Sequence, residues 1–107
     1  MVQELSCRDL AEQLDQKKPV ILLDVREDWE VEICMIGDSL HIPLSELPGR
    51  RAELPDDKPI AIICHHGVRS RHAGIFLEEY GFKDVFNVTG GIDVWALEIT
   101  PDMTRYD

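Results

Sequence analysis

The sequence predicts an α/β fold in which a parallel β-sheet carries helices on both faces. Two observations lead to this prediction. The apolar runs VILLDV, at residues 20–25, and IAII, at residues 60–63, have the length and composition of strands covered on both faces. The segments between the apolar runs have apolar residues at helical spacing, and strands that alternate with helices form the crossover units of a parallel sheet.

In the first half of the chain we expect a helix, a strand, a second helix and a second strand. Ser6 is placed to cap the first helix, LSCRDLAEQL, whose apolar residues share one face. The strand at residues 20–25 follows, and REDWEVEI at residues 26–33 predicts a short helix. SLHIP, at residues 39–43, predicts a short strand that its proline ends.

In the second half, residues 45–54 predict a helix with Ser45 as its cap and Pro48 in its first turn, where a missing N–H does little harm. After the strand IAII, residues 69–81 predict a helix that ends at Gly81, since glycine suits a left-handed stop. The remaining predicted elements are a strand at residues 85–88, a helix at residues 90–98 and an irregular surface tail, TPDMTRYD.

Composition limits the classes of protein that this chain can represent. A chain of 107 residues, 44% of them hydrophobic, predicts one globular domain over residues 1–107. The net charge of −10 disfavours nucleic acid and anionic membranes as partners. No window approaches a membrane span, and the N-terminus lacks the pattern of a signal peptide, so we expect a cytoplasmic protein. The three cysteines, Cys7, Cys34 and Cys64, are widely spaced and predict reduced thiols.

The stretch CHHGVRS, at residues 64–70, predicts the functional site. Cys64 follows the strand IAII directly, and ligands of open parallel sheets bind beyond the carboxyl ends of the strands. Gly67 eases the turn into a helix that begins near Arg69, and such a loop directs backbone N–H groups into its centre. A cysteine in this setting is favoured as the thiolate and is nucleophilic. The competing interpretation is a small buried apolar residue, which is the usual place of a lone cysteine.

Three other kinds of site fit the stretch less well. A metal site would need three consecutive residues, Cys64, His65 and His66, to converge on one ion, and no fourth ligand is evident. A dinucleotide loop would need a GxGxxG motif, which follows neither buried strand. A cysteine phosphatase has five residues between its cysteine and arginine, whereas four separate Cys64 from Arg69.

Three segments together resemble the single-domain rhodaneses, a family of sulfurtransferases. LLDVREDWEVEICMIGDSLHIPLSELPGR is similar to the family's DVR segment and the IP segment that follows it. IAIICHHGVRS is similar to the family's active loop, and FNVTGGIDVWA to its glycine-rich C-terminal motif. The resemblance implies a three-layer α/β/α fold with a five-stranded parallel sheet.

The resemblance also implies a chemistry, double displacement through a Cys64 persulfide. A donor such as thiosulfate or a persulfide gives up its outer sulfur, which then passes to a thiol, a protein thiol among them, or to cyanide. No organic cofactor or metal is implied. The alternative is a non-catalytic rhodanese-like module for docking or sulfur relay to a partner protein. The active loop that the resemblance implies comprises Cys64, His65, His66, Gly67, Val68, Arg69 and Ser70.

Residues outside the loop have supporting roles in this interpretation. Asp24 and Arg26 match the DVR motif, and we expect them to support the loop without direct catalysis, since a buried carboxylate needs a partner. Trp29 either lines the pocket or packs on the core. His41 is expected to be a structural histidine, and Cys34 could act on Cys64 only if the two lay close together.

Overall fold

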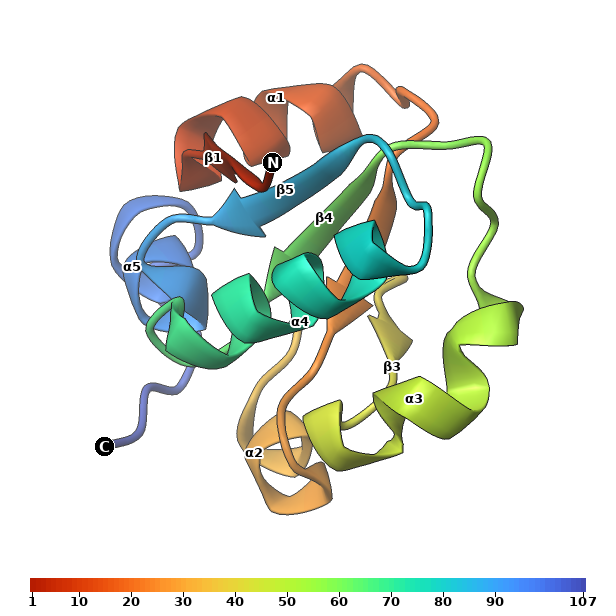
Figure 1. Ribbon diagram of the computed structural model, residues 1–107. Helices are drawn as coiled ribbons and strands as arrows, with labels where there is room; N and C mark the ends of the chain where they lie inside the picture. The colour runs from red at the N-terminus through yellow and green to blue at the C-terminus, as the bar shows by residue number, and fades with distance from the viewer.

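The computed structural model describes residues 1–107 and contains one parallel sheet of five strands in the order β1-β5-β4-β2-β3 (Figure 1). The predicted α/β fold with a five-stranded parallel sheet is therefore confirmed. The strands are β1 (Gln3–Leu5), β2 (Ile21–Asp24), β3 (Leu40–His41), β4 (Ile60–Ile63) and β5 (Val85–Val88). The helices are α1 (Cys7–Asp15), α2 (Asp28–Ile33), α3 (Leu47–Arg50), α4 (Val68–Glu79) and α5 (Gly91–Glu98).

Two hydrophobic clusters cover the two faces of the sheet. Because side chains alternate along a strand, Ile60 and Ile62 of β4 belong to one cluster, while Ala61 and Ile63 belong to the other. The first cluster includes residues of α3 and α4, and the second includes residues of α1 and α5. This three-layer packing buries every residue of the central strand β4, which explains its uninterrupted apolar sequence.

Local signals in the sequence account for several element ends. The Ser6 hydroxyl accepts a hydrogen bond from the Asp9 amide at 3.1 Å, so the predicted cap of α1 is confirmed. Gly81 has φ +93° just beyond α4, as expected of a left-handed stop. Pro48 lies in the first turn of α3, where its missing N–H costs no hydrogen bond.

One strand was not predicted, and one predicted helix was too long. The strand β1 was not predicted, because its three residues are mostly exposed and only their pairing with β5 identifies them as a strand. The helix predicted over residues 45–54 is reduced to α3, with a 3₁₀ turn on either side at Leu44–Glu46 and Arg51–Glu53. Ser45 lies inside the first of these turns and makes no cap.

The C-terminal segment is irregular, as predicted, but two of its side chains pack on the domain. Met103 and Tyr106 are half-buried and pack against the cluster that contains residues of α1 and α5.

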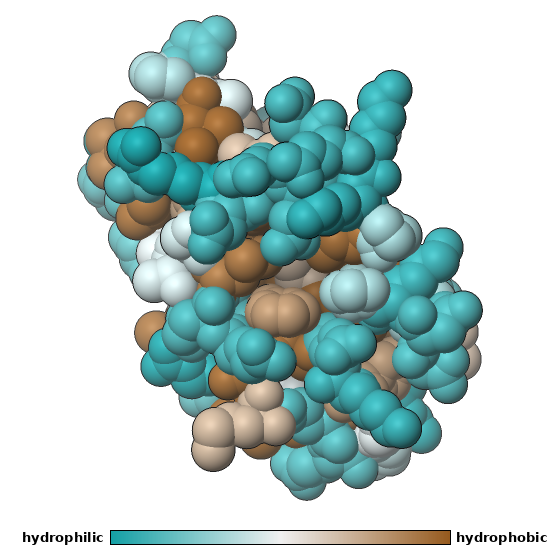
Figure 2. Space-filling model, turned by 90° about the horizontal axis from the view of Figure 1, so that it is seen from above, coloured by the Kyte–Doolittle hydropathy of each residue, from teal (hydrophilic) through white to brown (hydrophobic).

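Hydrophilic side chains cover most of the face seen from above, with hydrophobic patches between them (Figure 2). No helix of the structure combines the length and the apolar character that crossing a membrane requires.

Candidate functional site

Cys64 lies immediately beyond the carboxyl end of β4, between β2 and β5 of the sheet. Its Sγ accepts a hydrogen bond from the Gly67 amide at 3.0 Å and lies 3.3 Å from the Ser70 hydroxyl. The residue is 1% exposed, so the sulfur sits at the bottom of its loop. A backbone donor aimed at a buried sulfur stabilises negative charge on that atom.

The sequence folds into this loop because of a glycine at the right place. Gly67 has φ +111° and caps α4, which begins at Val68. This backbone conformation is rarely open to other residues, and it turns the Gly67 amide back toward the sulfur. The predicted role of Gly67 is confirmed, and the helix begins one residue earlier than predicted. Val68 itself points outward and is 65% exposed.

The N-terminus of α5 holds the first two residues of the loop. The Ile92 amide donates to the Cys64 carbonyl at 2.8 Å, and the Asp93 amide donates to the His65 carbonyl at 3.2 Å. This contact needs a residue without a side chain at Gly91, where a Cβ atom would lie 2.4 Å from both carbonyl oxygens. The glycine-rich segment before α5 therefore positions the cysteine, although it lies 27 residues away in the chain.

A chain of polar side chains leads from the sulfur to the surface. The buried Ser70 hydroxyl donates to the Asn87 carbonyl oxygen, and the Asn87 amide donates to the Glu4 carboxylate at 3.1 and 3.3 Å. Glu4 lies exposed at the surface, and although slight burial of its carboxylate opposes ionisation, hydrogen bonds from Thr89, Arg71 and Asn87 lower its pKa. The ionised Glu4 fixes the Asn87 amide with its oxygen toward Ser70. The Ser70 hydroxyl proton thus points away from Cys64, which leaves a Ser70 lone pair to face the sulfur.

Asp24 and Arg26 form a fully buried ion pair beside the loop. The Arg26 guanidinium donates to the Asp24 carboxylate through Nε at 2.9 Å and Nη2 at 2.7 Å. It also donates to the carbonyls of Glu30 and Cys34, at 3.2 and 2.7 Å, which ties α2 and the chain beyond it to β2. The expected pairing of Asp24 with Arg26 is found, and neither side chain makes a hydrogen bond to the Cys64 sulfur.

Arg69 is paired with a carboxylate that the sequence did not single out. Its guanidinium donates to Glu30 through two nitrogens, at 2.5 and 2.7 Å. Arg71 likewise donates to Glu4 at 2.9 Å, so both arginines that follow Gly67 are paired with carboxylates. Burial opposes ionisation of Glu30, but hydrogen bonds from Arg69, the Glu27 amide and Tyr106 lower its pKa from 4.5 to about 2.

A second residue that contacts the site and that the sequence interpretation did not include is Tyr106. Its ring stacks on His65 with the centroids 4.1 Å apart, and its carbonyl oxygen lies 2.8 Å from His65 Nε2. Its hydroxyl donates to Glu30 at 2.7 Å and accepts from Arg26 at 3.2 Å. Burial and the Glu30 carboxylate raise the pKa of Tyr106 to about 12, so the phenol remains a neutral donor. The one available signal was an aromatic residue in an otherwise polar tail.

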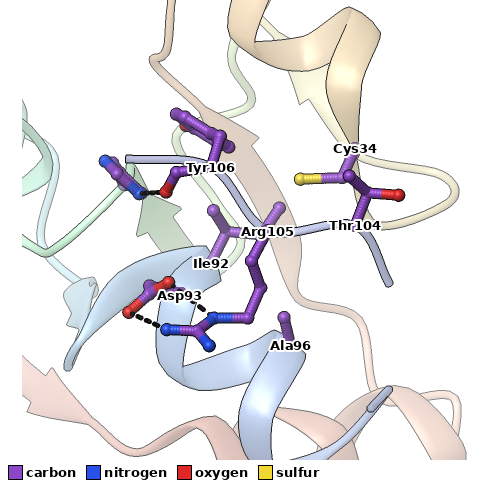
Figure 3. A pocket seen from close by; sticks show the side chains of 8 residues that line it. Cys34, Ile92, Asp93, Ala96, Thr104, Arg105 and Tyr106 are labelled. Atoms are coloured by element: carbon purple, nitrogen blue, oxygen red, sulfur yellow. Dashed lines mark hydrogen bonds and ion pairs between the residues drawn. The ribbon is translucent and has the colours of Figure 1, made fainter. Parts of the chain in front are cut away.

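The structure also places the remaining candidates. His66 is exposed and its ring packs against that of His65, with the centroids 3.9 Å apart. Trp29 is 57% exposed and meets Tyr106 edge-on, so it does not pack on the core. His41 has the expected structural partner, since its Nε2 lies 2.6 Å from the Arg26 carbonyl. All three cysteines are free thiols, and Cys34 lines a narrow crevice with His65 and Tyr106 (Figure 3).

Acid is expected to weaken the fold through Glu30. Because its pKa falls from 4.5 to about 2 on folding, the stabilisation is complete above pH 4.5 and is lost as the pH falls toward 2. The loss is on the order of 3 kcal/mol, since each pKa unit corresponds to about 1.4 kcal/mol. Urea unfolding of the wild type and Glu30→Gln across this range measures it. The difference in unfolding free energy should shrink toward pH 2, and a difference that is independent of pH would contradict the assignment.

The fold and the site together define a class of protein. It is the class of parallel α/β domains that carry a cysteine at the tip of a central strand, in a short loop that feeds a helix. Comparison with known families assigns the chain within that class. Residues 6–98 match the model of the rhodanese-like domain, and the chain belongs to this family.

Relatives and solved structures agree with this assignment. The chain is 38% identical to the putative sulfurtransferase YtwF of Bacillus subtilis, over 94% of this chain and 96% of that protein. It is 31% identical to the thiosulfate sulfurtransferase GlpE of Coxiella burnetii, over 78% of each. The crystal structure of a rhodanese-related protein from Thermoplasma volcanium has a TM-score of 0.83 and 39% identity, covering 92% of this chain and 95% of that one. These similarities support a general role in sulfur transfer.

Proposed function

We propose that this protein is a sulfurtransferase that carries sulfane sulfur as a persulfide on Cys64. The observation that carries the proposal is the position of this sulfur at the end of β4, with the Gly67 amide donating to it at 3.0 Å. The same residues form the part of the chain that resembles the active loop of the family. Further support comes from relatives whose names describe sulfur transfer.

The first half-reaction loads the cysteine. After Cys64 loses its proton, the thiolate attacks the outer sulfur of the donor. A new S–S bond forms on Cys64 while the donor's own S–S bond breaks. With thiosulfate the leaving group is sulfite, which departs with the electron pair of the broken bond. The Gly67 amide stabilises the negative charge on the thiolate before attack, and we expect the loop to stabilise the charge of the persulfide in the same way.

Ser70 supports this step through its single hydroxyl proton. With that proton donated to Asn87, the Ser70 oxygen is placed to accept a hydrogen bond from the Cys64 thiol. Once Cys64 is ionised, rotation of the hydroxyl directs the same proton to the thiolate. The buried serine can therefore serve both protonation states without moving its oxygen.

The second half-reaction unloads the cysteine. A thiol or cyanide attacks the terminal sulfur of the persulfide, and the S–S bond breaks with its electrons on the Cys64 sulfur. Cyanide yields thiocyanate, and a thiolate yields a new persulfide. Each cycle thus restores the Cys64 thiolate. No oxidant or reductant is consumed, because the sulfur moves between partners at the same oxidation level.

For the donor we propose thiosulfate or a low-molecular-weight persulfide. Thiosulfate is supported by the name of the GlpE relative. The Arg69–Glu30 pair argues against a strong preference of the site for a dianionic donor. The Glu30 carboxylate offsets the positive charge of Arg69, the one arginine in the loop. Direct contact of Arg69 with the donor requires this pair to open. Persulfide donors, which carry a lower charge than thiosulfate, are therefore part of the proposal.

The test is a single-turnover experiment in the absence of acceptor. Mixing the reduced protein with thiosulfate should release sulfite in a burst of about one molecule per Cys64, as expected of a covalent intermediate. Addition of cyanide should then release thiocyanate in the same amount. A persulfide donor should give a matching burst of free thiol. Absence of a burst with every sulfane donor would overturn the proposal.

A further inference from the structure

One residue outside the predicted site contacts the start of the Cys64 loop directly and is linked to its end through Glu30. Tyr106 touches the start of the loop through His65, by a ring stack and by its carbonyl oxygen. It reaches the end of the loop indirectly, since its hydroxyl donates to the Glu30 carboxylate that holds Arg69. Tyr106 lies outside residues 6–98, the part of the chain that matches the family model.

The neighbouring residues fix Tyr106 in this position. Arg105 donates to both carboxylate oxygens of Asp93 on α5, at 3.0 and 3.3 Å, and Figure 3 shows residues 104–106 running alongside this helix. Arg26, which is fully buried, donates to the Tyr106 hydroxyl at 3.2 Å. The crevice between this segment and α5 is too narrow to hold a water molecule. Residues 104–106 are therefore packed against the domain.

We propose that Tyr106 is a specificity-determining residue of the Cys64 site, a clasp that admits small sulfur donors and acceptors and excludes bulky ones. The clasp consists of the Tyr106 contacts to His65 and to the Glu30–Arg69 pair. In the clasped form Cys64 is 1% exposed and Arg69 is engaged by Glu30. The proposal rests on the proposed function for its biological meaning. The physical property that it describes is the access of reagents to the Cys64 thiol.

The dependence on reagent size follows from which Tyr106 contacts must break to admit the reagent. A small reagent needs only a local displacement of the loop rim, which leaves most clasp contacts intact. A bulky reagent needs the Tyr106 ring to leave His65 and its hydroxyl to leave Glu30 and Arg26. Removing the ring removes this requirement for the bulky reagent, and changes much less for the small one.

Alkylation of Cys64 measures this access directly. We would compare iodoacetamide, which is small, with fluorescein maleimide, which is bulky, and follow the Cys64 peptide by mass spectrometry. The variants are Tyr106→Ala, which removes the clasp, and Tyr106→Phe, which keeps the ring and loses the hydroxyl contacts. Tyr80→Ala is the matched control, because Tyr80 is the other tyrosine of the chain and lies exposed just beyond the C-terminal end of α4.

With fluorescein maleimide, Tyr106→Ala should react about tenfold faster than the wild type, as expected when a stack and two hydrogen bonds are lost. Tyr106→Phe should react about fivefold faster, since only the two hydroxyl hydrogen bonds are lost. With iodoacetamide, neither variant should differ from the wild type by more than about twofold. Tyr80→Ala should match the wild type with both reagents.

Two results would overturn the proposal. Unchanged rates in Tyr106→Ala would show that the contacts do not limit access, and equal acceleration with both reagents would show that they do not select by size. Circular dichroism establishes whether each variant is folded. If Tyr106→Ala is not folded, the alkylation rates of Tyr106→Phe test the proposal. Alkylation does not depend on sulfur transfer. If alkylation depends on Tyr106 but no sulfite burst is observed, the proposed function is overturned and the proposal for Tyr106 is still supported.

Discussion

Cys64→Ser should reduce sulfur transfer to the rate measured without protein, for every donor and acceptor. A serine hydroxyl forms no persulfide, so the proposed covalent route has no intermediate in this variant. The substitution keeps the size and shape of the side chain, and the Gly67 amide can donate to the new oxygen. Stability should therefore change by only about 1 kcal/mol. Thiocyanate formation and urea unfolding measure the two effects separately.

The matched control is Cys34→Ser. Cys34 is also a free thiol near Tyr106, but it is half-buried in the crevice and makes no hydrogen bond with the loop residues 64–70. Its removal should leave most of the transfer rate in place. Cys7 is a third thiol, and burial raises its pKa to about 11, which makes it a poor nucleophile at neutral pH. Loss of activity in Cys34→Ser comparable to that in Cys64→Ser would contradict the assignment of Cys64.

Gly91→Ala should be the most destabilising single-methyl change in the region of the site. The added Cβ would lie 2.4 Å from the carbonyl oxygens of Cys64 and His65, and the residue has φ +65°. Backbone strain and a steric clash each cost roughly 1–3 kcal/mol, so we expect a loss of about 4 kcal/mol in unfolding free energy. The hydrogen bonds from α5 to the loop should weaken as well, because the helix start must move away from both carbonyls.

Gly37→Ala provides the comparison for this substitution. A Cβ at Gly37 would meet nothing within 4 Å, and its φ lies outside the left-handed region. Its unfolding free energy should change by about 0.5 kcal/mol or less. Urea unfolding of both variants, together with the rate of Cys64 alkylation, separates a general effect of alanine from the clash at α5. Equal stability of the two variants would contradict the role given to Gly91.

Strong local patterns explain how much of the fold could be predicted from the sequence. The apolar strands β2, β4 and β5 need no partner to be recognised, and Ser6 and Gly81 mark helix ends by chemistry that acts within a few residues. The strand β1 carries no such pattern. Its identity as a strand depends on pairing with β5, more than 80 residues further along the chain.

The site follows the same division between local and distant contacts. Cys64 and Gly67 were predictable because the loop between a strand and a helix determines their geometry. Glu30 and Tyr106 were not, because each becomes part of the site only through contacts 39 to 76 residues apart in the chain. In the sequence, Glu30 is one of several acids on a short helix and is typical of a solvated surface.

The distant contacts also determine the electrostatics of the site. Arg69 and Arg71, the two arginines that follow Cys64 most closely in the sequence, are each paired with a carboxylate. Charge pairing of this kind depends on which elements meet in three dimensions. The spacing of residues along the chain does not encode it in any simple way.

The most direct test of the sulfurtransferase proposal is the location of the transferred sulfur. Reduced protein would be treated with thiosulfate, freed of excess donor and analysed by intact-mass and peptide mass spectrometry. We expect the mass of one added sulfur atom, located on the peptide that contains Cys64 and removed by cyanide. An added sulfur found on Cys7 or Cys34 with Cys64 unmodified, or no added sulfur from any sulfane donor, would contradict the account.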